Sequence, residues 1–172
     1  MSSFPPVLNI GCGQVKIPNS VGVDIDPKSC ADVIHDLDIF PWPFPDQAFD
    51  RIVCWHVIEH VRNPRRTMSE IARLAKPGAK IEMATPHYSS PDSWGDMTHY
   101  HHFSLKSFQP FYIPGSGAPP IFDLVSRQLK FGRGLPSLIG RAIAAVFGLP
   151  FYEKYCCFVF RAGNMEFEFR RR

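Results

Sequence analysis

The stretch LNIGCGQVKIPNSVGVDID, residues 8–26, constrains the fold of this chain more than any other. One apolar run ends at Gly11-Cys12-Gly13, and a second, residues 21–23, ends at Asp24. Apolar runs followed by glycines and then by an acid are typical of the first two strands of a nucleotide-binding parallel sheet. Residues 14–20 between them are too few for the crossover helix that normally joins such strands. The stretch therefore predicts two parallel strands with a reduced helix between them.

The rest of the chain alternates short apolar runs with helical patterns, which predicts an α/β fold. A helix is expected from Asn63-Pro64 to Pro77-Gly78, because Asn63 can cap its first turn and proline suits the first helical position. A second helix is expected at residues 138–147. The expected strands are residues 7–10, 21–24, 32–35, 51–55, 80–84, 122–131, 156–160 and 165–169. The last two would meet at the turn 162–164 as an antiparallel hairpin, so the sheet is predicted to be mostly parallel with an antiparallel late edge.

Length, composition and charge constrain the number of domains and the cellular location of the protein. The 172 residues, 45% hydrophobic and 20% charged, fit one domain spanning residues 1–172. No apolar stretch reaches the roughly 20 residues that span a bilayer, and the N-terminus resembles no signal peptide, so a cytoplasmic protein is expected. The five cysteines form no CxxC pair and fit reduced thiols. A net charge of +3 is too small to be a strong nucleic-acid signal.

Potential ligand-binding residues follow the predicted strands at their carboxyl ends, where open α/β sheets bind ligands. They are Gly11, Gly13, Asp24, Asp36, His56 and residues 85–87. Glycine lets the backbone approach a ligand, and a carboxylate can accept hydrogen bonds from ribose hydroxyls. The run GCGQVK lacks the third glycine of a dinucleotide motif, and no helix is available to hold a pyrophosphate. This disfavours NAD or FAD and favours a nucleoside cofactor without phosphates.

Five segments together carry a resemblance to a known family: LNIGCG, VGVDIDP, HDL, FPDQAFDRIVCWHVIEHV and EIARLAKPGAKIEMATPH. Through them the chain resembles the class I S-adenosylmethionine (SAM)-dependent methyltransferases of the type 11 group. The contracted first connection is similar to that of a trimmed subgroup. The resemblance implies a three-layer Rossmann-like sheet and methyl transfer from SAM to a small-molecule or saccharide acceptor at oxygen or nitrogen. A degenerate methyltransferase fold acting as a non-catalytic binding or regulatory module is the alternative, and a nicotinamide-dependent enzyme is a weaker one.

The resemblance also assigns the cofactor site by position. Gly11 and Gly13 would line the methionine part of SAM, and Asp24 would hold the ribose. Asp36 and Leu37 would flank the adenine, and His56 would lie near the sulfonium. The neighbouring residues Cys12 and Ile25 complete the predicted cofactor site.

The histidine-rich segment of residues 86–120 is expected to be an insert on the acceptor side. Within it, His99 is the first candidate for a general base and His87 the second, because histidine can accept a proton near neutral pH. The alternative is a polar lid whose histidines form structural hydrogen bonds.

In HVIEHV, a helical arrangement would place His56, Glu59 and His60 on one face, where they could bind a metal together with His87. The alternative is that Glu59 and His60 anchor the loop after the fourth strand by hydrogen bonds. Of the two, we expect this alternative and no bound metal. One face of the sheet is expected to be thinly covered, which favours a homodimer or a membrane-proximal partner.

Overall fold

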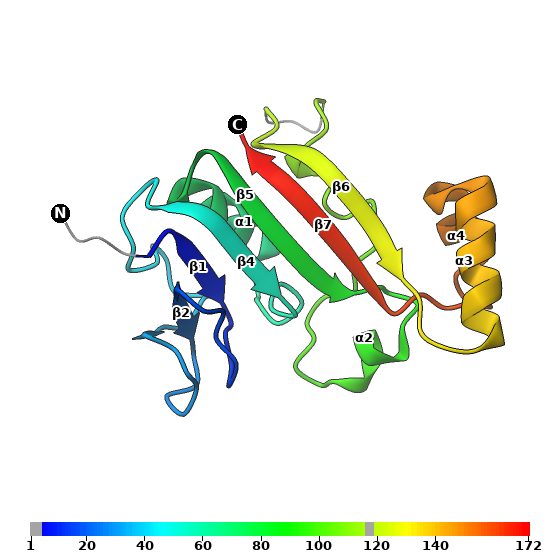
Figure 1. Cartoon of the computed structure of the whole chain (residues 1–172), viewed down its shortest axis with the longest axis horizontal. Coiled ribbons are helices and arrows are strands. Elements are labelled where there is room, and N and C mark those ends of the chain that lie inside the picture. Colours follow the sequence, from blue (N-terminus) through cyan, green and yellow to red (C-terminus); the bar gives the residue numbers. More distant parts are fainter. Residues whose placement is uncertain (1–4, 116–118) are drawn as a thin grey trace.

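The computed structural model describes residues 5–115 and 119–172, and in these ranges it contains a seven-stranded sheet (Figure 1). The strand order is β3-β2-β1-β4-β5-β7-β6. The strands are β1 (Val7–Ile10), β2 (Ser20–Asp24), β3 (Val33–Ile34), β4 (Phe49–Trp55), β5 (Ala75–Pro86), β6 (Phe122–Lys130) and β7 (Asn164–Arg171). Strands β1 to β5 pair in parallel, and β7 is antiparallel to both β5 and β6. The predicted parallel sheet with an antiparallel late edge is confirmed.

The connection between β1 and β2 contains no helix, as predicted, and packs closely against the sheet instead. The Asn9 side chain accepts a hydrogen bond of 2.9 Å from the Ile17 amide, and Lys16 Nζ lies 2.6 Å from Asp32 Oδ1. A Cβ atom at Gly22 would come within 2.8 Å of Lys16 Cδ. The lysine stem therefore covers the part of β2 that a crossover helix would otherwise cover.

The helical segments are α1 (Pro64–Leu74), α2 (Pro91–Gly95), the 3-10 turn η1 (Gln109–Phe111), α3 (Leu135–Phe147) and α4 (Leu149–Tyr155). Helix α1 begins as predicted, with the Asn63 side chain accepting a hydrogen bond from the Arg66 amide at 3.0 Å. It ends earlier than predicted, because Ala75 already pairs with Phe49 at the start of β5.

Within the described residues, one face of β5, β7 and β6 is packed together with the adjoining part of β4. Its side chains, from Ile52, Ile81, Met83, Phe167 and Phe169, are at most 3% exposed and share one core with α1 and residues 103–112. The opposite face carries charged side chains, and Lys80 Nζ lies 3.2 Å from both Glu82 and Glu168. In Figure 1 this face of β5, β7 and β6 points toward the viewer without a helix over it, and α1 lies behind the sheet. Among the described residues the three expected layers are thus reduced here to two.

The predicted strand at residues 156–160 is wrong. This segment continues from α4 in turns, with the Cys156 amide bonded to Tyr152 O at 2.9 Å and the Phe160 amide to Cys156 O at 3.0 Å. Its run of apolar residues has no alternation of buried and exposed side chains that would distinguish a strand from a buried turn. The antiparallel partner of β7 on this edge is β6.

Candidate functional site

A cavity of about 370 Å³ lies at the carboxyl ends of β1, β2 and β4. Most of the residues predicted to bind the cofactor line it: Gly11, Asp24, Ile25, Asp36, Leu37 and His56. Cys12 and Gly13 are not among its lining residues. The structure therefore brings together residues from widely separated parts of the sequence, as expected for the carboxyl edge of a parallel sheet.

Asp24 is held in a fixed orientation by two backbone amides. Its Oδ2 atom accepts a hydrogen bond from the Gly13 amide at 2.8 Å, and its Oδ1 atom accepts one from the Asp26 amide at 2.9 Å. Each carboxylate oxygen has a second acceptor site, so the group can still bind two hydroxyls. Gly13 thus contributes by orienting Asp24 rather than by lining the cavity.

Cys12 packs beneath the first loop. Its side chain is buried, and its Sγ atom occupies the space beside Gly22, where a Cβ atom would come within 2.8 Å of it. Burial, together with the charge of nearby Asp24, raises the pKa of the Cys12 thiol. The side chain of Cys12 is therefore a neutral packing group in this structure.

Gly11 allows β1 to turn sharply beside the cavity. Its φ of +59° is in the left-handed region, and its amide donates to Val23 O at 2.8 Å. A Cβ atom at this position would lie only 2.2 Å from Cγ2 of Val57, which also lines the cavity. Both the backbone conformation and the available space therefore require glycine.

We expect Gly11→Ala to destabilise the fold and to weaken ligand binding. The left-handed conformation alone costs a non-glycine residue about 1–2 kcal/mol, and the clash displaces Val57 from the cavity wall. Urea denaturation and a calorimetric titration with SAM measure the two effects. The matched control is Gly95→Ala, where a Cβ atom meets nothing within 4 Å. Equal stability and affinity in the two variants would contradict the role of Gly11.

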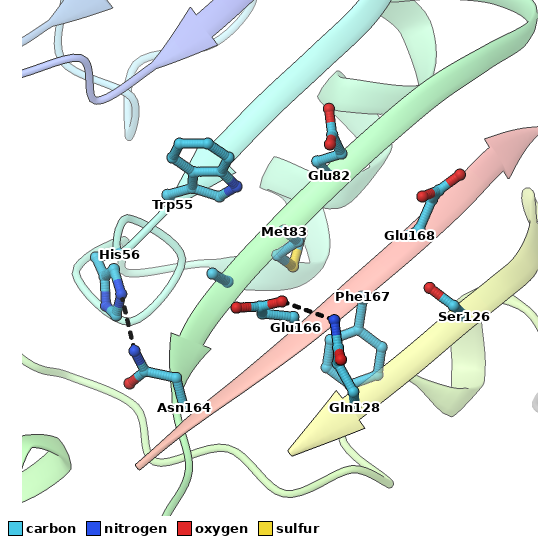
Figure 2. Close-up of a pocket in the computed structure, with 11 residues that line it drawn as sticks. Trp55, His56, Glu82, Met83, Ser126, Gln128, Asn164, Glu166, Phe167 and Glu168 are labelled. Carbon is cyan, nitrogen blue, oxygen red and sulfur yellow. Dashed lines mark hydrogen bonds between the residues drawn. The ribbon is translucent and has the colours of Figure 1, made fainter. Parts of the chain in front are cut away.

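A second cavity, of about 390 Å³, lies on the uncovered face of the sheet across β4, β5, β7 and β6 (Figure 2). Its wall includes Trp55, Gln128, Asn164 and Glu166, and His56 lines both cavities. Figure 2 shows His56 and Asn164 pointing toward one another, with His56 Nε2 3.4 Å from Asn164 Nδ2. His56 therefore lies at the boundary between the two spaces.

His56 also contacts a buried carboxylate. Its Nδ1 atom lies 3.4 Å from Glu59 Oε1, and this contact raises the pKa of His56 although partial burial opposes it. Glu59 is 1% exposed, and its Oε2 atom accepts a hydrogen bond from Thr85 Oγ1 at 3.0 Å. Its Oε1 atom has no hydrogen-bond partner within the ranges that the structure describes.

The residues that could hold a metal differ from the predicted set. Glu59, His60 and His99 each contribute one potential ligand atom, and these three atoms lie within 4.8 Å of one another. His56 is not part of this group. The Nδ1 atoms of His60 and His99 contact backbone carbonyls, Thr98 O at 3.2 Å and Ser93 O at 3.1 Å. This geometry also fits the alternative that the side chains anchor the loops around the cavity. The expectation that no metal is bound stays a prediction.

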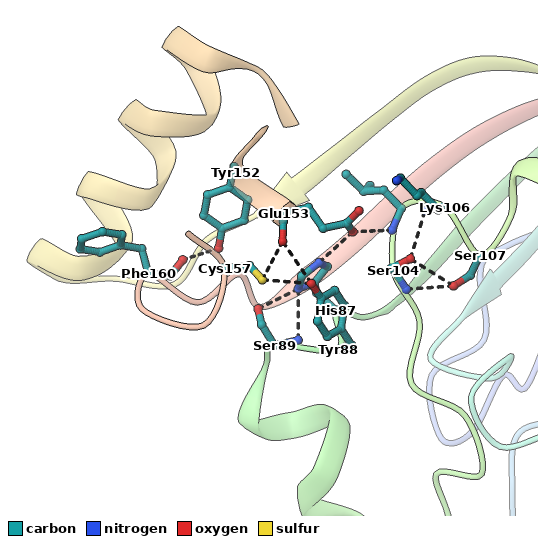
Figure 3. A network of polar contacts seen from close by, with 11 residues as sticks. His87, Tyr88, Ser89, Ser104, Lys106, Ser107, Tyr152, Glu153, Cys157 and Phe160 are labelled. Atoms are coloured by element: carbon teal, nitrogen blue, oxygen red, sulfur yellow. Dashed lines mark hydrogen bonds and ion pairs between the residues drawn. The ribbon is translucent and has the colours of Figure 1, made fainter. Parts of the chain in front are cut away.

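The two histidines predicted as general bases are not among the described residues that line either cavity. His87 is fully buried, with Nδ1 2.7 Å from Ser89 Oγ and Nε2 3.2 Å from Glu153 Oε1 (Figure 3). His99 is held by Ser93 O and packs edge-on against His60, with ring centroids 4.6 Å apart. In this structure both histidines have structural contacts.

Sequence reasoning does not identify four residues that line the first cavity: Asp38, Val57, Val61 and Arg62. The Arg62 amide donates to Asp38 Oδ1 at 2.8 Å, and the Arg62 guanidinium lies 5.5 Å from the centre of the Tyr100 ring. Tyr100 belongs to the histidine-rich segment, whose amides at 100 and 101 bond to Glu59 O. The segment therefore closes one side of the cavity.

Comparison with known proteins finds a methyltransferase-domain family that matches this chain. Residues 4–113 match a family described as a methyltransferase domain. Ajmaline N-methyltransferase of Rauvolfia serpentina is 36% identical over 76 residues, which cover 43% of this chain and 25% of that protein. The chain spans only 25% to 52% of the length of the curated relatives that it matches.

Solved structures resemble the whole fold. A SAM-dependent methyltransferase from Archaeoglobus fulgidus has a TM-score of 0.62 at 19% identity, covering 96% of this chain and 85% of that one. The [4+2]-cyclase SpnF has a TM-score of 0.60 at 18% identity, covering 96% and 74%. At these identities the likeness establishes the fold alone.

Proposed function

The chain belongs to the methyltransferase-domain family, because the family match covers more than half of its residues. From this premise we propose that the chain transfers a methyl group from SAM to a small-molecule or saccharide acceptor, at oxygen or nitrogen. The observation that carries the proposal is the cavity at the ends of β1, β2 and β4. Most of the residues expected to bind the cofactor line this cavity. The connection between β1 and β2 beside it has no helix that could hold a pyrophosphate.

In this proposal the chain's own residues hold and align SAM. Asp24, already oriented by two amides, accepts the ribose hydroxyls, and Asp36 and Leu37 flank the adenine. The missing side chain of Gly11 leaves room for the methionine part. Methyl transfer is an in-line displacement on a sulfonium, so alignment of the acceptor atom with the methyl carbon supplies much of the acceleration.

We propose that the acceptor occupies the cavity of Figure 2 and meets SAM beside His56. The support is that His56 lines both cavities and that the second wall carries hydrogen-bonding groups from Asn164, Gln128 and Glu166. Such a wall suits a polar acceptor with hydroxyl or amino groups. A base is needed only if the acceptor atom must lose a proton. His99 and His87 would have to move to serve that role, whereas His56 lies at the boundary.

The alternative is a non-catalytic binding module. The uncovered sheet face and the few helices favour it, and the likeness to the [4+2]-cyclase SpnF agrees with this fold serving other activities. The two candidates differ in what happens after SAM binds. A binding module retains SAM without passing its methyl group to any acceptor.

We expect calorimetric titration to detect SAM binding by the purified chain, because the cavity presents a preoriented carboxylate and close backbone. Absence of binding at near-millimolar SAM would defeat the enzyme proposal. Transfer of a labelled methyl group to a panel of amines and saccharides then separates the enzyme from the module. A parallel fluorescence titration with NADH serves as the specificity control, and tight binding there would contradict the choice of cofactor.

A further inference from the structure

Helix α3 turns an apolar face toward solvent, the reverse of an ordinary amphipathic surface helix. Four of its exposed large side chains recur at i, i+3, i+4 and i+11, so these four lie on one stripe. They are Leu135, Leu138, Ile139 and Val146, with exposed fractions of 68%, 58%, 37% and 74%. The opposite side of the helix, at Gly140 and Ala144, is buried, and a Cβ atom at Gly140 would meet Phe160 and Phe131.

Exposed aromatic side chains continue from Phe147, the last residue of α3, into α4 and the segment after it. Phe147, Phe151 and Tyr155 form a ladder in which successive ring centroids are 5.0 Å apart, and Phe158 and Val159 follow with 70% exposure each. We call the combined set the α3–α4 apolar surface: Leu135, Leu138, Ile139, Val146, Phe147, Phe151, Tyr155, Phe158 and Val159. A contiguous exposed set of this kind marks an interaction site more often than scattered exposed residues do.

The exposed charges of the segment that carries this surface, residues 131–161, have one sign. The basic residues of the segment 131–161 are all exposed: Arg133, Arg141, Lys154 and Arg161. The acidic residue of the same segment is Glu153, which is 8% exposed and turned inward, where its Oε1 atom accepts hydrogen bonds from His87 and the Leu105 amide (Figure 3). No carboxylate of this segment therefore faces outward beside the apolar surface.

We propose that the α3–α4 apolar surface binds the surface of an anionic lipid bilayer, with α3 lying in the plane of the interface. An apolar helical stripe flanked by cations and aromatic rings is the pattern of interfacial helices, and anionic lipid attracts the flanking arginines and lysine. A second copy of the chain fits less well, because it would bring two sets of unpaired cations together.

The geometry favours a helix that lies on the bilayer rather than crossing it. No helix within residues 5–115 and 119–172 is long and apolar enough to span a membrane. Helix α3 has 13 residues, about 20 Å at 1.5 Å per residue. The buried contact of Glu153 with His87 fixes α4 to the segment that directly follows β5. Figure 1 shows α3 and α4 beyond β6, the edge strand of the sheet.

Sedimentation with large unilamellar vesicles tests the proposal. We expect the chain to sediment with vesicles of phosphatidylcholine and phosphatidylglycerol in equal parts, far less with phosphatidylcholine alone, and less as salt rises. The double variant Leu138→Gln/Val146→Gln should lose about tenfold or more in vesicle affinity, because two apolar side chains no longer enter the interface. Arg141→Glu should weaken binding to the anionic vesicles and leave binding to phosphatidylcholine vesicles unchanged. Val15→Gln is the matched control, since Val15 is 84% exposed in the first loop, outside this surface.

The proposal is overturned if the folded chain stays in the supernatant with anionic vesicles, or if the double variant and Val15→Gln bind equally well. It is also overturned if analytical ultracentrifugation shows a dimer that the double variant dissociates while vesicles bind neither form. Circular dichroism of each variant checks folding, and the exposed positions make loss of fold a poor explanation of lost binding. The readout needs no SAM, so its failure is distinct from failure of the methyltransferase proposal.

Discussion

Asp24→Ala is expected to weaken SAM binding about tenfold or more, because a hydrogen bond to a charged group contributes roughly 1.5–3 kcal/mol. The substitution removes the proposed ribose acceptor. It also removes the group that binds the Gly13 and Asp26 amides, so the first loop loses two anchors. Isothermal titration with SAM measures the affinity, and thermal unfolding measures the effect on the loop.

Two companion variants distinguish these contributions. Asp24→Asn keeps one acceptor oxygen and nearly the same volume, so its affinity should fall between those of the parent and Asp24→Ala. Asp26→Ala removes a carboxylate two residues away that bonds the Lys28 amide and is not among the lining residues of the cavity. It should leave the affinity nearly unchanged. If Asp24→Ala behaves like Asp26→Ala, Asp24 is not part of the SAM site.

The first half of the fold could be predicted because its determinants are local in sequence. Buried parallel strands appear as apolar runs, and Gly11 and Asp24 stand directly at their ends. The rule that parallel strands present their carboxyl ends at one edge then brought residues of three strands together correctly. The missing helix could also be predicted, because the chain between the strands is too short to form one.

The positions of some other features depend on contacts that no short sequence pattern records. The segment 156–160 is as apolar as a strand, but β6 rather than this segment occupies the edge beside β7. His87 follows β5, where a catalytic residue is expected, yet its partner Glu153 is 66 residues away and holds it in the interior. Tyr100 reaches the cavity because the backbone at 100 and 101 bonds to Glu59.

Removal of the Glu153 carboxylate is expected to give the largest loss of stability among single substitutions in the network of Figure 3. In Glu153→Ala the His87 ring nitrogen and the Leu105 amide, at 3.2 Å and 2.7 Å from Glu153 Oε1, lose their shared acceptor. Each buried polar group left unsatisfied costs about 1–3 kcal/mol, so the free energy of unfolding should fall by several kcal/mol. Urea denaturation measures this fall. Asp123→Asn, which alters an exposed ion pair with Arg172, should change it by less than about 1 kcal/mol.

The lowered pKa of Glu153 indicates that its charged form stabilises the fold, which predicts a pH dependence. Burial would raise the pKa of Glu153, but hydrogen bonds from His87 and the Leu105 amide outweigh it, and the folded-state pKa is lowered. A lowered pKa means that the stabilisation is complete above the unfolded-state value of about 4.3 and is lost as the pH falls through the folded-state pKa. The nearby charge of Lys106 also lowers the pKa of Glu153. The stability difference between the parent and Glu153→Gln should therefore shrink on acidification below about pH 4. A difference that stays constant with pH would mean that Glu153 contributes by its shape and hydrogen bonds, without its charge.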